Sequence, residues 1–181
     1  MTRFRLRQTI SVSICLHWLT ALLFVAAYAT IELRELFPKD SAPREAMKSW
    51  HYMAGLSILA VAWLRLLLRS FMAPRVDGPQ MPRWQALASK AGHIALYALM
   101  IALPLLGWLT LSAEGEPLFF FGFDVPALIA PNDGLAEQFE ELHETVGKVG
   151  YGLIGLHVLA ALIHHYVLRD ATLVRMLPAR S

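Results

Sequence analysis

Four long stretches without a charged side chain most constrain how this chain can fold. They cover residues 8–31, 49–64, 91–113 and 149–168. A helix rises ~1.5 Å per residue and the hydrocarbon core of a bilayer is ~30 Å thick, so about 20 apolar residues cross it. Three stretches reach this length directly, and the second reaches it by including Arg65. The pattern predicts an all-α integral membrane protein built as a four-helix transmembrane bundle.

The composition agrees with this prediction. Of the 181 residues, 56% are hydrophobic and 17% are charged, whereas soluble domains carry about 25% charged residues. The single cysteine, Cys15, excludes an internal disulfide and any multi-cysteine metal cluster. We expect one membrane domain over residues 1–181, with transmembrane helices near 10–31, 49–69, 91–113 and 143–168.

The first apolar stretch has an alternative interpretation as a secretory signal. Arg3, Arg5 and Arg7 precede it, and the triplet 27–29 resembles a cleavage site. However, the stretch is longer than the ~7–15 residues of a usual signal core, and cleavage would remove His17. We therefore favour a retained first helix.

The charged residues outside the stretches are distributed unequally. Four spans place the N-terminus, the segment 66–90 and the C-terminal tail on one side of the membrane. That side holds 11 of the 16 basic residues, counting Arg65 at its margin, but only Asp77 and Asp170 among the acids. The opposite side holds five basic and twelve acidic residues. Because cytoplasmic loops are enriched in Lys and Arg, we expect both termini in the cytoplasm.

Histidine inside a bilayer is costly and marks a functional site by default. The chain has seven histidines, which are His17, His51, His93, His143, His157, His164 and His165. On the fourth span, His143, His157 and His164 are separated by 14 and 7 residues, which places them on one helix face. His143 and His157 lie ~21 Å apart along the axis, so they would serve two separate centres.

Helix direction supplies a partner for each of these two histidines. His51 begins the second span at the depth of His143, and His17 lies near the other membrane face at the depth of His157. Zinc would need three or four ligands, and neither level offers a carboxylate or thiolate to complete such a set. Haem iron needs only two axial imidazoles, so two b-type haems are the simplest interpretation. A bundle whose histidines make only polar contacts is the alternative.

Three further features have both a functional and a structural interpretation. Haem propionates need cationic partners, and Arg65 with Arg69 on one side, or Lys48 or Lys148 on the other, could supply them or simply snorkel. Glycines around Gly150 could admit a macrocycle or allow tight helix packing. Four phenylalanines between spans three and four are either interfacial anchors or a cap over a buried group; they are Phe119, Phe120, Phe121 and Phe123.

Several short motifs resemble the bacterial cytochrome b561 family over nearly the whole chain. They are the strings 13–18 (SICLHW), 50–55 (WHYMAG), 90–93 (KAGH), 142–145 (LHET), 155–157 (GLH) and 164–166 (HHY). The resemblance is closest to small stand-alone members that pass electrons from superoxide to ubiquinone in the bacterial inner membrane. It implies two haem b groups, one held by His17 with His157 and the other by His51 with His143.

The same resemblance implies a quinone near the cytoplasmic face. His93 and His164 are the candidate quinone residues, because imidazole can donate hydrogen bonds and relay protons. Arg83 and Lys90 on the adjoining segment are possible helpers, and His165 has no assigned role.

Three functions therefore compete at this point. The first is a superoxide:ubiquinone oxidoreductase, although the outer side carries a net charge of about −7, which does not attract an anion. The second is a cytochrome b relay subunit that anchors a periplasmic dehydrogenase or hydrogenase and passes its electrons to quinone. The third, a metal-ion carrier, lacks a membrane-embedded carboxylate beside the histidines.

Overall fold

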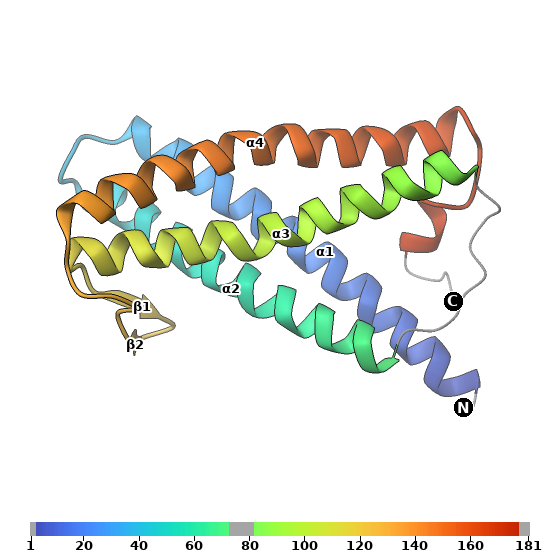
Figure 1. Ribbon diagram of the computed structural model, residues 1–181, viewed down its shortest axis with the longest axis horizontal. Helices are drawn as coiled ribbons and strands as arrows, with labels where there is room; N and C mark the ends of the chain where they lie inside the picture. The colour runs from blue at the N-terminus through green and yellow to red at the C-terminus, as the bar shows by residue number, and fades with distance from the viewer. Residues whose placement is uncertain (1–2, 73–81, 178–181) are drawn as a thin grey trace.

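The computed structural model describes residues 3–72 and 82–177, with side chains described for 12–71 and 82–177. Four long helices dominate it, and they are α1 (Arg3–Leu33), α2 (Ala42–Met72), α3 (Arg83–Glu114) and α4 (Asp133–Tyr166) (Figure 1). The short elements are the 3-10 turns η1 (Arg34–Leu36) and η2 (Val174–Met176) and the strands β1 (Leu118–Phe120) and β2 (Phe123–Val125). All four long helices are long and apolar enough to span a membrane. The predicted all-α transmembrane bundle is therefore confirmed.

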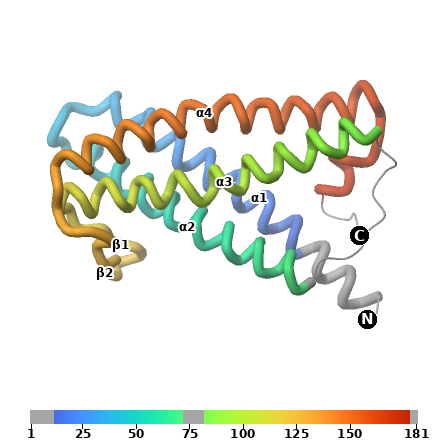
Figure 2. Tube along the Cα trace, in the orientation of Figure 1, coloured from blue at the N-terminus to red at the C-terminus, as the bar shows by residue number. Residues whose placement is uncertain are grey.

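The helices alternate in direction and form two pairs. α1 packs mainly against α2, and α3 against α4, while a smaller α2–α3 contact joins the pairs. The α1–α2 connection and the β1–β2 hairpin lie together at one end of the bundle, which we call the hairpin end (Figure 2). The start of α1 and the end of α4 lie at the opposite end, which we call the terminal end. α1 and α3 therefore run from the terminal end toward the hairpin end, and α2 and α4 run back.

α4 begins ten residues before the start predicted from apolarity, at Asp133. Asn132 caps it, since its side-chain oxygen accepts a hydrogen bond from the amide of Leu135 at 3.0 Å. The acidic Asp133 in the first turn also complements the positive end of the helix dipole. Local capping thus extends the helix beyond the apolar stretch into a polar region.

The connection between α3 and α4 contains a β-hairpin that we did not predict from the sequence. Its strands pair antiparallel with Leu118 opposite Val125, and the turn residues Phe121 and Gly122 have φ values of 48° and 85°. Leu118 is buried, whereas Phe119, Phe121 and Phe123 are exposed. This exposure favours the role of interfacial anchors over that of a cap.

The interior of the bundle is small and its outer surface is apolar. A cluster of buried side chains joins α1, α2 and α3, and it consists of Ala27, Ala54, Ile58, Ala62 and Met100. Large apolar side chains such as Leu22, Val25 and Leu156 are about two-thirds exposed. Exposed apolar side chains of this size are compatible with lipid and unfavourable in water. The packing therefore agrees with a multi-pass membrane protein.

Candidate functional site

The structure brings four of the seven histidines together as two pairs. His17 on α1 faces His157 on α4 with 6.1 Å between the ring centroids. His51 on α2 faces His143 on α4 with 6.0 Å between the centroids. The first pair lies toward the terminal end and the second toward the hairpin end, so α4 contributes one imidazole at each level.

The spacing of the two pairs fits iron ligation. Two metal–nitrogen bonds of ~2 Å each, together with ~1 Å from each nitrogen to its ring centre, span about 6 Å. The helices that carry each pair do not pack closely on one another. Within the described residues, α4 packs extensively against α3 and makes few backbone contacts with α1 or α2. A flat porphyrin between the rings needs such a separation of the helices. The residues present therefore fit a bis-imidazole haem at either level.

At the hairpin end, backbone carbonyls fix both rings of the pair. Nδ1 of His51 donates to the carbonyl of Ala27 at 2.9 Å, and Nδ1 of His143 donates to the carbonyl of Leu103 at 3.0 Å. A donating Nδ1 leaves Nε2 with its lone pair as the metal-binding atom, and such a bond also orients the ring. The two Nε2 atoms are thus the available ligand atoms of this pair.

His143 reaches the Leu103 carbonyl across a glycine. A Cβ on Gly107 would lie 3.2 Å from Cε1 of the His143 ring, which is tighter than an ordinary contact. Gly107 stands one helical turn after Leu103, so its bare Cα leaves the carbonyl accessible from α4. We did not predict a role for Gly107, although a glycine within an uncharged helix was the available signal.

Around the terminal-end pair, a third histidine and a cation lie close by. The ring of His93 on α3 is 5.9 Å from that of His157, and its Nδ1 donates to the carbonyl of Ser89 at 2.6 Å. Arg65 on α2 donates from Nη1 to the hydroxyl of Thr20 at 3.1 Å. Two of the predicted site residues, His93 and Arg65, therefore lie near this pair.

A tyrosine occupies the space in front of Gly150. The hydroxyl of Tyr28 on α1 donates to the carbonyl of Gly147 at 2.9 Å, and a Cβ on Gly150 would clash with that hydroxyl oxygen. The ring of Tyr28 packs on Tyr151, whose hydroxyl donates to Glu32 at 2.7 Å. Gly150 thus makes room for the Tyr28 side chain that bridges α1 and α4, which favours a packing role over an approach by a macrocycle.

His164 has a partner in the segment that follows α4. Its Nδ1 and Oδ2 of Asp170 are 2.5 Å apart. The hydrogen bond from His164, followed by those from Thr172, lowers the pKa of Asp170 to about 2. A second contact at this end joins Trp18 Nε1 to the carbonyl of Met176 at 2.7 Å. These contacts fold the C-terminal segment back against the terminal end of the bundle.

The other predicted residues of the terminal end lie on the surface. Arg83 begins α3, and Lys90 and His93 follow on the same helix one turn apart. Arg69 in the last turn of α2 is exposed, as are Arg83 and Lys90. The ring of His165 packs edge-on against Tyr166 with 4.7 Å between centroids.

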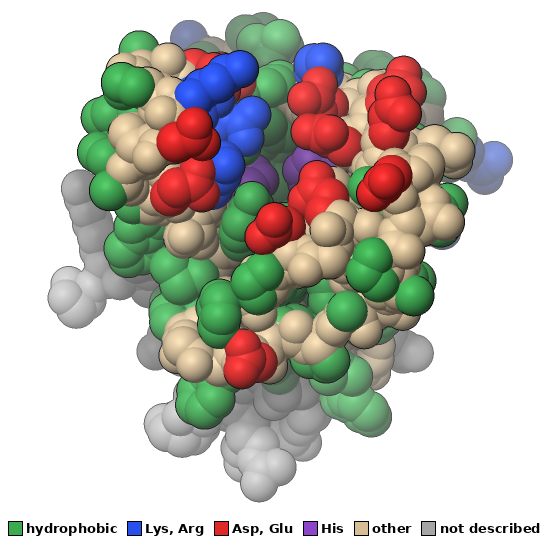
Figure 3. Space-filling view, turned by 90° about the vertical axis from the view of Figure 1, so that its left-hand side faces the viewer, with side chains coloured by type: hydrophobic (Ala, Val, Ile, Leu, Met, Phe, Trp, Pro, Cys, Tyr) green, Lys and Arg blue, Asp and Glu red, His purple; other side chains and the backbone are tan. Residues whose placement is uncertain are grey.

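A shallow pocket with four cationic side chains lies at the hairpin end. It is lined by Arg34, Lys39, Asp40, Arg44, Glu45 and Lys48. Arg44 organises it, since its guanidinium donates to the carbonyls of Arg34 and Phe37 and to the Glu35 carboxylate. Figure 3 shows the hairpin end, where Lys and Arg side chains gather on one side of a recess that contains histidine.

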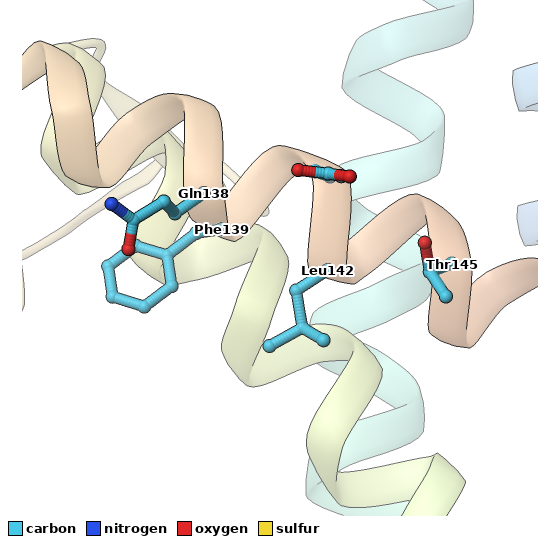
Figure 4. A pocket seen from close by; sticks show the side chains of 5 residues that line it. Gln138, Phe139, Leu142 and Thr145 are labelled. Atoms are coloured by element: carbon cyan, nitrogen blue, oxygen red, sulfur yellow. The ribbon is translucent and has the colours of Figure 1, made fainter.

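Acidic side chains gather on the opposite side of that recess (Figure 3). The first half of α4 contributes several of them, which are Asp133, Glu137, Glu140, Glu141 and Glu144. A second pocket follows this part of α4 and is lined by Gln138, Phe139, Glu141, Leu142 and Thr145 (Figure 4). The hairpin end therefore presents a face of mixed charge, where cations are paired with acids, and an acidic face on either side of the recess that contains histidine (Figure 3).

These features together define a class of protein. A four-helix membrane bundle with imidazole pairs at two depths has the architecture of a b-type membrane cytochrome. Comparison with known proteins identifies the particular family. The chain matches the family described as prokaryotic cytochrome b561 over residues 9–179.

Three curated relatives cover nearly the whole chain. Cytochrome b561 homolog 1 of Escherichia coli is 38% identical over 181 residues, all of both chains. The probable superoxide oxidase CybB of Yersinia pestis is 37% identical over 91% of this chain and 93% of its own. Cytochrome b561 homolog 2 of Escherichia coli is 32% identical over 94% and 91%. The chain therefore belongs to the prokaryotic cytochrome b561 family, whose members bind haem b, and it is a multi-pass protein of the bacterial inner membrane.

Proposed function

We propose that this protein is a di-haem superoxide:ubiquinone oxidoreductase. Its hairpin end faces the periplasm and both termini face the cytoplasm. Superoxide gives up an electron at the hairpin-end pair, and ubiquinone is reduced at the terminal end. Bound haem supplies reversible one-electron redox chemistry at both levels.

The observation that carries the proposal is the pair of matched histidine distances. Ring centroids 6.1 Å and 6.0 Å apart at two depths give two sites of the same ligand geometry. Two such sites on one helix provide a path across the membrane, which a single haem near one face would not. Membership in a family that includes a probable superoxide oxidase supports the choice of donor.

The hairpin end is acidic as a whole and should repel superoxide, but the pocket with four cationic side chains reduces this repulsion locally. Arg34, Lys39, Arg44 and Lys48 gather on one side of the recess, where they outnumber the neighbouring acids Glu35, Asp40 and Glu45, so this side repels an anion less than the acidic side does. Superoxide approaches on that side, loses one electron and leaves as neutral O₂, which the pocket no longer attracts. Two imidazoles would hold each haem, and the bound group would supply outer-sphere one-electron chemistry, so superoxide would need no bond to the metal.

At the terminal end, two electrons from two superoxide anions and two protons convert ubiquinone to ubiquinol. His93 and His164 are the proposed quinone residues, with Arg83 and Lys90 nearby on α3. His164 is hydrogen-bonded to Asp170, and this bond would fix the orientation of the imidazole for proton transfer. Arg69, and Lys48 or Lys148, are the proposed partners of the haem propionates, whereas Arg65 donates to the Thr20 hydroxyl instead.

The decisive experiment is an anaerobic visible spectrum of the purified protein with a pyridine haemochrome count. We expect two haems per chain, rapid reduction by a superoxide pulse and reoxidation by added ubiquinone. Superoxide dismutase, added first, is the control and should abolish the reduction. Two haems that respond to dithionite and ignore superoxide would contradict the donor assignment.

The acidic side of the recess supports a second candidate, the cytochrome b relay subunit. Glu137, Glu140 and Glu144 could dock a basic periplasmic dehydrogenase or hydrogenase. Such a subunit would co-purify with its partner and would need it for turnover. Quinone reduction by the isolated protein with superoxide as sole donor would exclude it.

A further inference from the structure

Arg65 is placed inside the bundle beside the terminal-end histidines. It extends from α2 to Thr20, which is 5% exposed and stands one helical turn after His17 on α1. The hydroxyl of Thr20 in turn donates to the carbonyl of Leu16 at 2.6 Å. This chain of bonds fixes the guanidinium close to His17.

The third helix completes the surroundings of the guanidinium. Cζ of Arg65 lies 5.5 Å from the ring centroid of Tyr97, and Tyr97 stands one turn after His93 on α3. A cation over an aromatic ring is stabilised without losing its charge. The Thr20 hydroxyl and the Tyr97 ring are neutral partners, and within the described residues no carboxylate pairs with Arg65, so its positive charge is not offset there.

The hairpin-end pair has a different environment. Backbone carbonyls of Ala27 and Leu103 accept from the two Nδ1 atoms. Such bonds raise the basicity of the ligand nitrogens and so favour the more positive, oxidised metal. The cationic pocket and the acids of α4 also flank this pair with charges of both signs, whereas within the described residues Arg65 beside the terminal-end pair forms no salt bridge.

We propose that Arg65, held by Thr20 and Tyr97, makes the terminal-end haem the better electron acceptor of the two and so sets the direction of electron flow. The inference rests on the proposed di-haem function. Reduction of ferric to ferrous iron removes one positive charge, so a nearby cation favours the reduced state. Arg65 would therefore raise the reduction potential of the terminal-end haem without touching the substrate.

The test is a redox titration of the purified di-haem protein, followed in the visible bands. Arg65→Gln should lower the potential of one haem, so that the equilibrium constant for electron transfer from the hairpin-end haem to the terminal-end haem falls about tenfold, or ~59 mV for one electron. Arg65→Lys should keep the constant within about threefold of the native value, because the charge is retained. Arg175→Gln is the matched control, since it removes an exposed cation at the same end.

Single-haem backgrounds identify which haem responds. Arg65→Gln combined with His51→Ala, which keeps the terminal-end haem, should show the shift. The same change combined with His17→Ala should leave the potential of the hairpin-end haem unchanged. An equal shift in both backgrounds would overturn the inference, because the effect would then be a general one.

If Arg65→Gln loses a haem, its redox titration cannot test the inference, and a second variant takes its place. Thr20→Val keeps the charge and frees the guanidinium, and should lower the same constant about two- to threefold. No shift in Thr20→Val or in Arg65→Gln, with two haems bound, overturns this inference and leaves the proposed function intact. A native protein without haem overturns both.

Discussion

The two histidine pairs have nearly the same geometry and different surroundings. Their centroid distances differ by only 0.1 Å, yet the hairpin-end rings are bonded to backbone carbonyls and the terminal-end rings lie near Arg65 and His93. The hairpin end opens to a charged recess, whereas the C-terminal segment folds over the terminal end. In the proposed function, one histidine pattern would therefore serve two tasks, and the neighbours of each pair would decide which task it performs.

Removal of one ligand from each pair should separate the two centres. We expect His17→Ala and His51→Ala each to lose one whole haem and keep the other, because an imidazole is the only protein bond on that side of the iron. The pyridine haemochrome count per chain measures this loss. His165→Ala is the control and should keep both haems, and a ligand variant that keeps two would contradict the pairing.

Neutralisation of the cationic pocket should affect only the hairpin end. The double variant Lys39→Gln with Lys48→Gln should slow haem reduction by superoxide about three- to tenfold at low salt, because steering depends on local potential. Stopped-flow absorbance at several ionic strengths measures the rate, and the difference should shrink as salt rises. The paired control is Glu137→Gln with Glu140→Gln on the acidic side, which should not slow the reaction.

Gly107→Ala should disturb the hairpin-end pair and spare the other. The new methyl group would press on the His143 ring, at a cost of about 1 kcal/mol in stability. Thermal unfolding in detergent, together with the spectrum of each haem, measures the effect. Gly92→Ala on the same helix meets nothing within 4 Å, so it should be neutral or stabilising by ~0.5–1 kcal/mol; equal destabilisation by both would contradict the proposed contact.

The smallest effect should come from the contact between His164 and Asp170. The folded-state pKa of Asp170 is about 2, below the ~3.9 of an unfolded aspartate. The stabilisation of the C-terminal segment is therefore fully present above pH ~4 and is lost as the pH falls toward 2. Amide hydrogen exchange of residues 170–177 measures this stabilisation. Asp170→Asn should remove its pH dependence, and at neutral pH the variant should protect these amides slightly less than the native protein does.

The sequence was sufficient for those features that follow from helix period and direction. Apolar length predicted the four helices, and their alternating direction predicted which histidines meet, as the 6.1 Å and 6.0 Å distances show. That these rings ligate haem iron stays a prediction. The same reasoning did not predict which contacts the loops between the helices make.

The remaining features depend on packing between helices or on turn geometry. The Arg65–Thr20 bond joins residues 45 positions apart, and nothing in either local sequence indicates the other. The contact of His164 with Asp170 requires the chain to reverse after α4, where Arg169 has a φ of 54°. The hairpin at 118–125 depends on the turn at Phe121 and Gly122, which the run of phenylalanines concealed.

His143 and His157 lie 14 positions apart on α4, and this spacing has an electrical consequence. It separates the two levels by ~21 Å, roughly two thirds of a ~30 Å hydrocarbon core. In the proposed orientation, with the hairpin end in the periplasm, each electron would move toward the negative side of the energised membrane, and each proton taken up from the cytoplasm would add to the same charge separation. A full crossing stores about 2.3 kcal/mol per charge at 100 mV. Removal of superoxide would thus charge the membrane and would slow as the membrane potential rises.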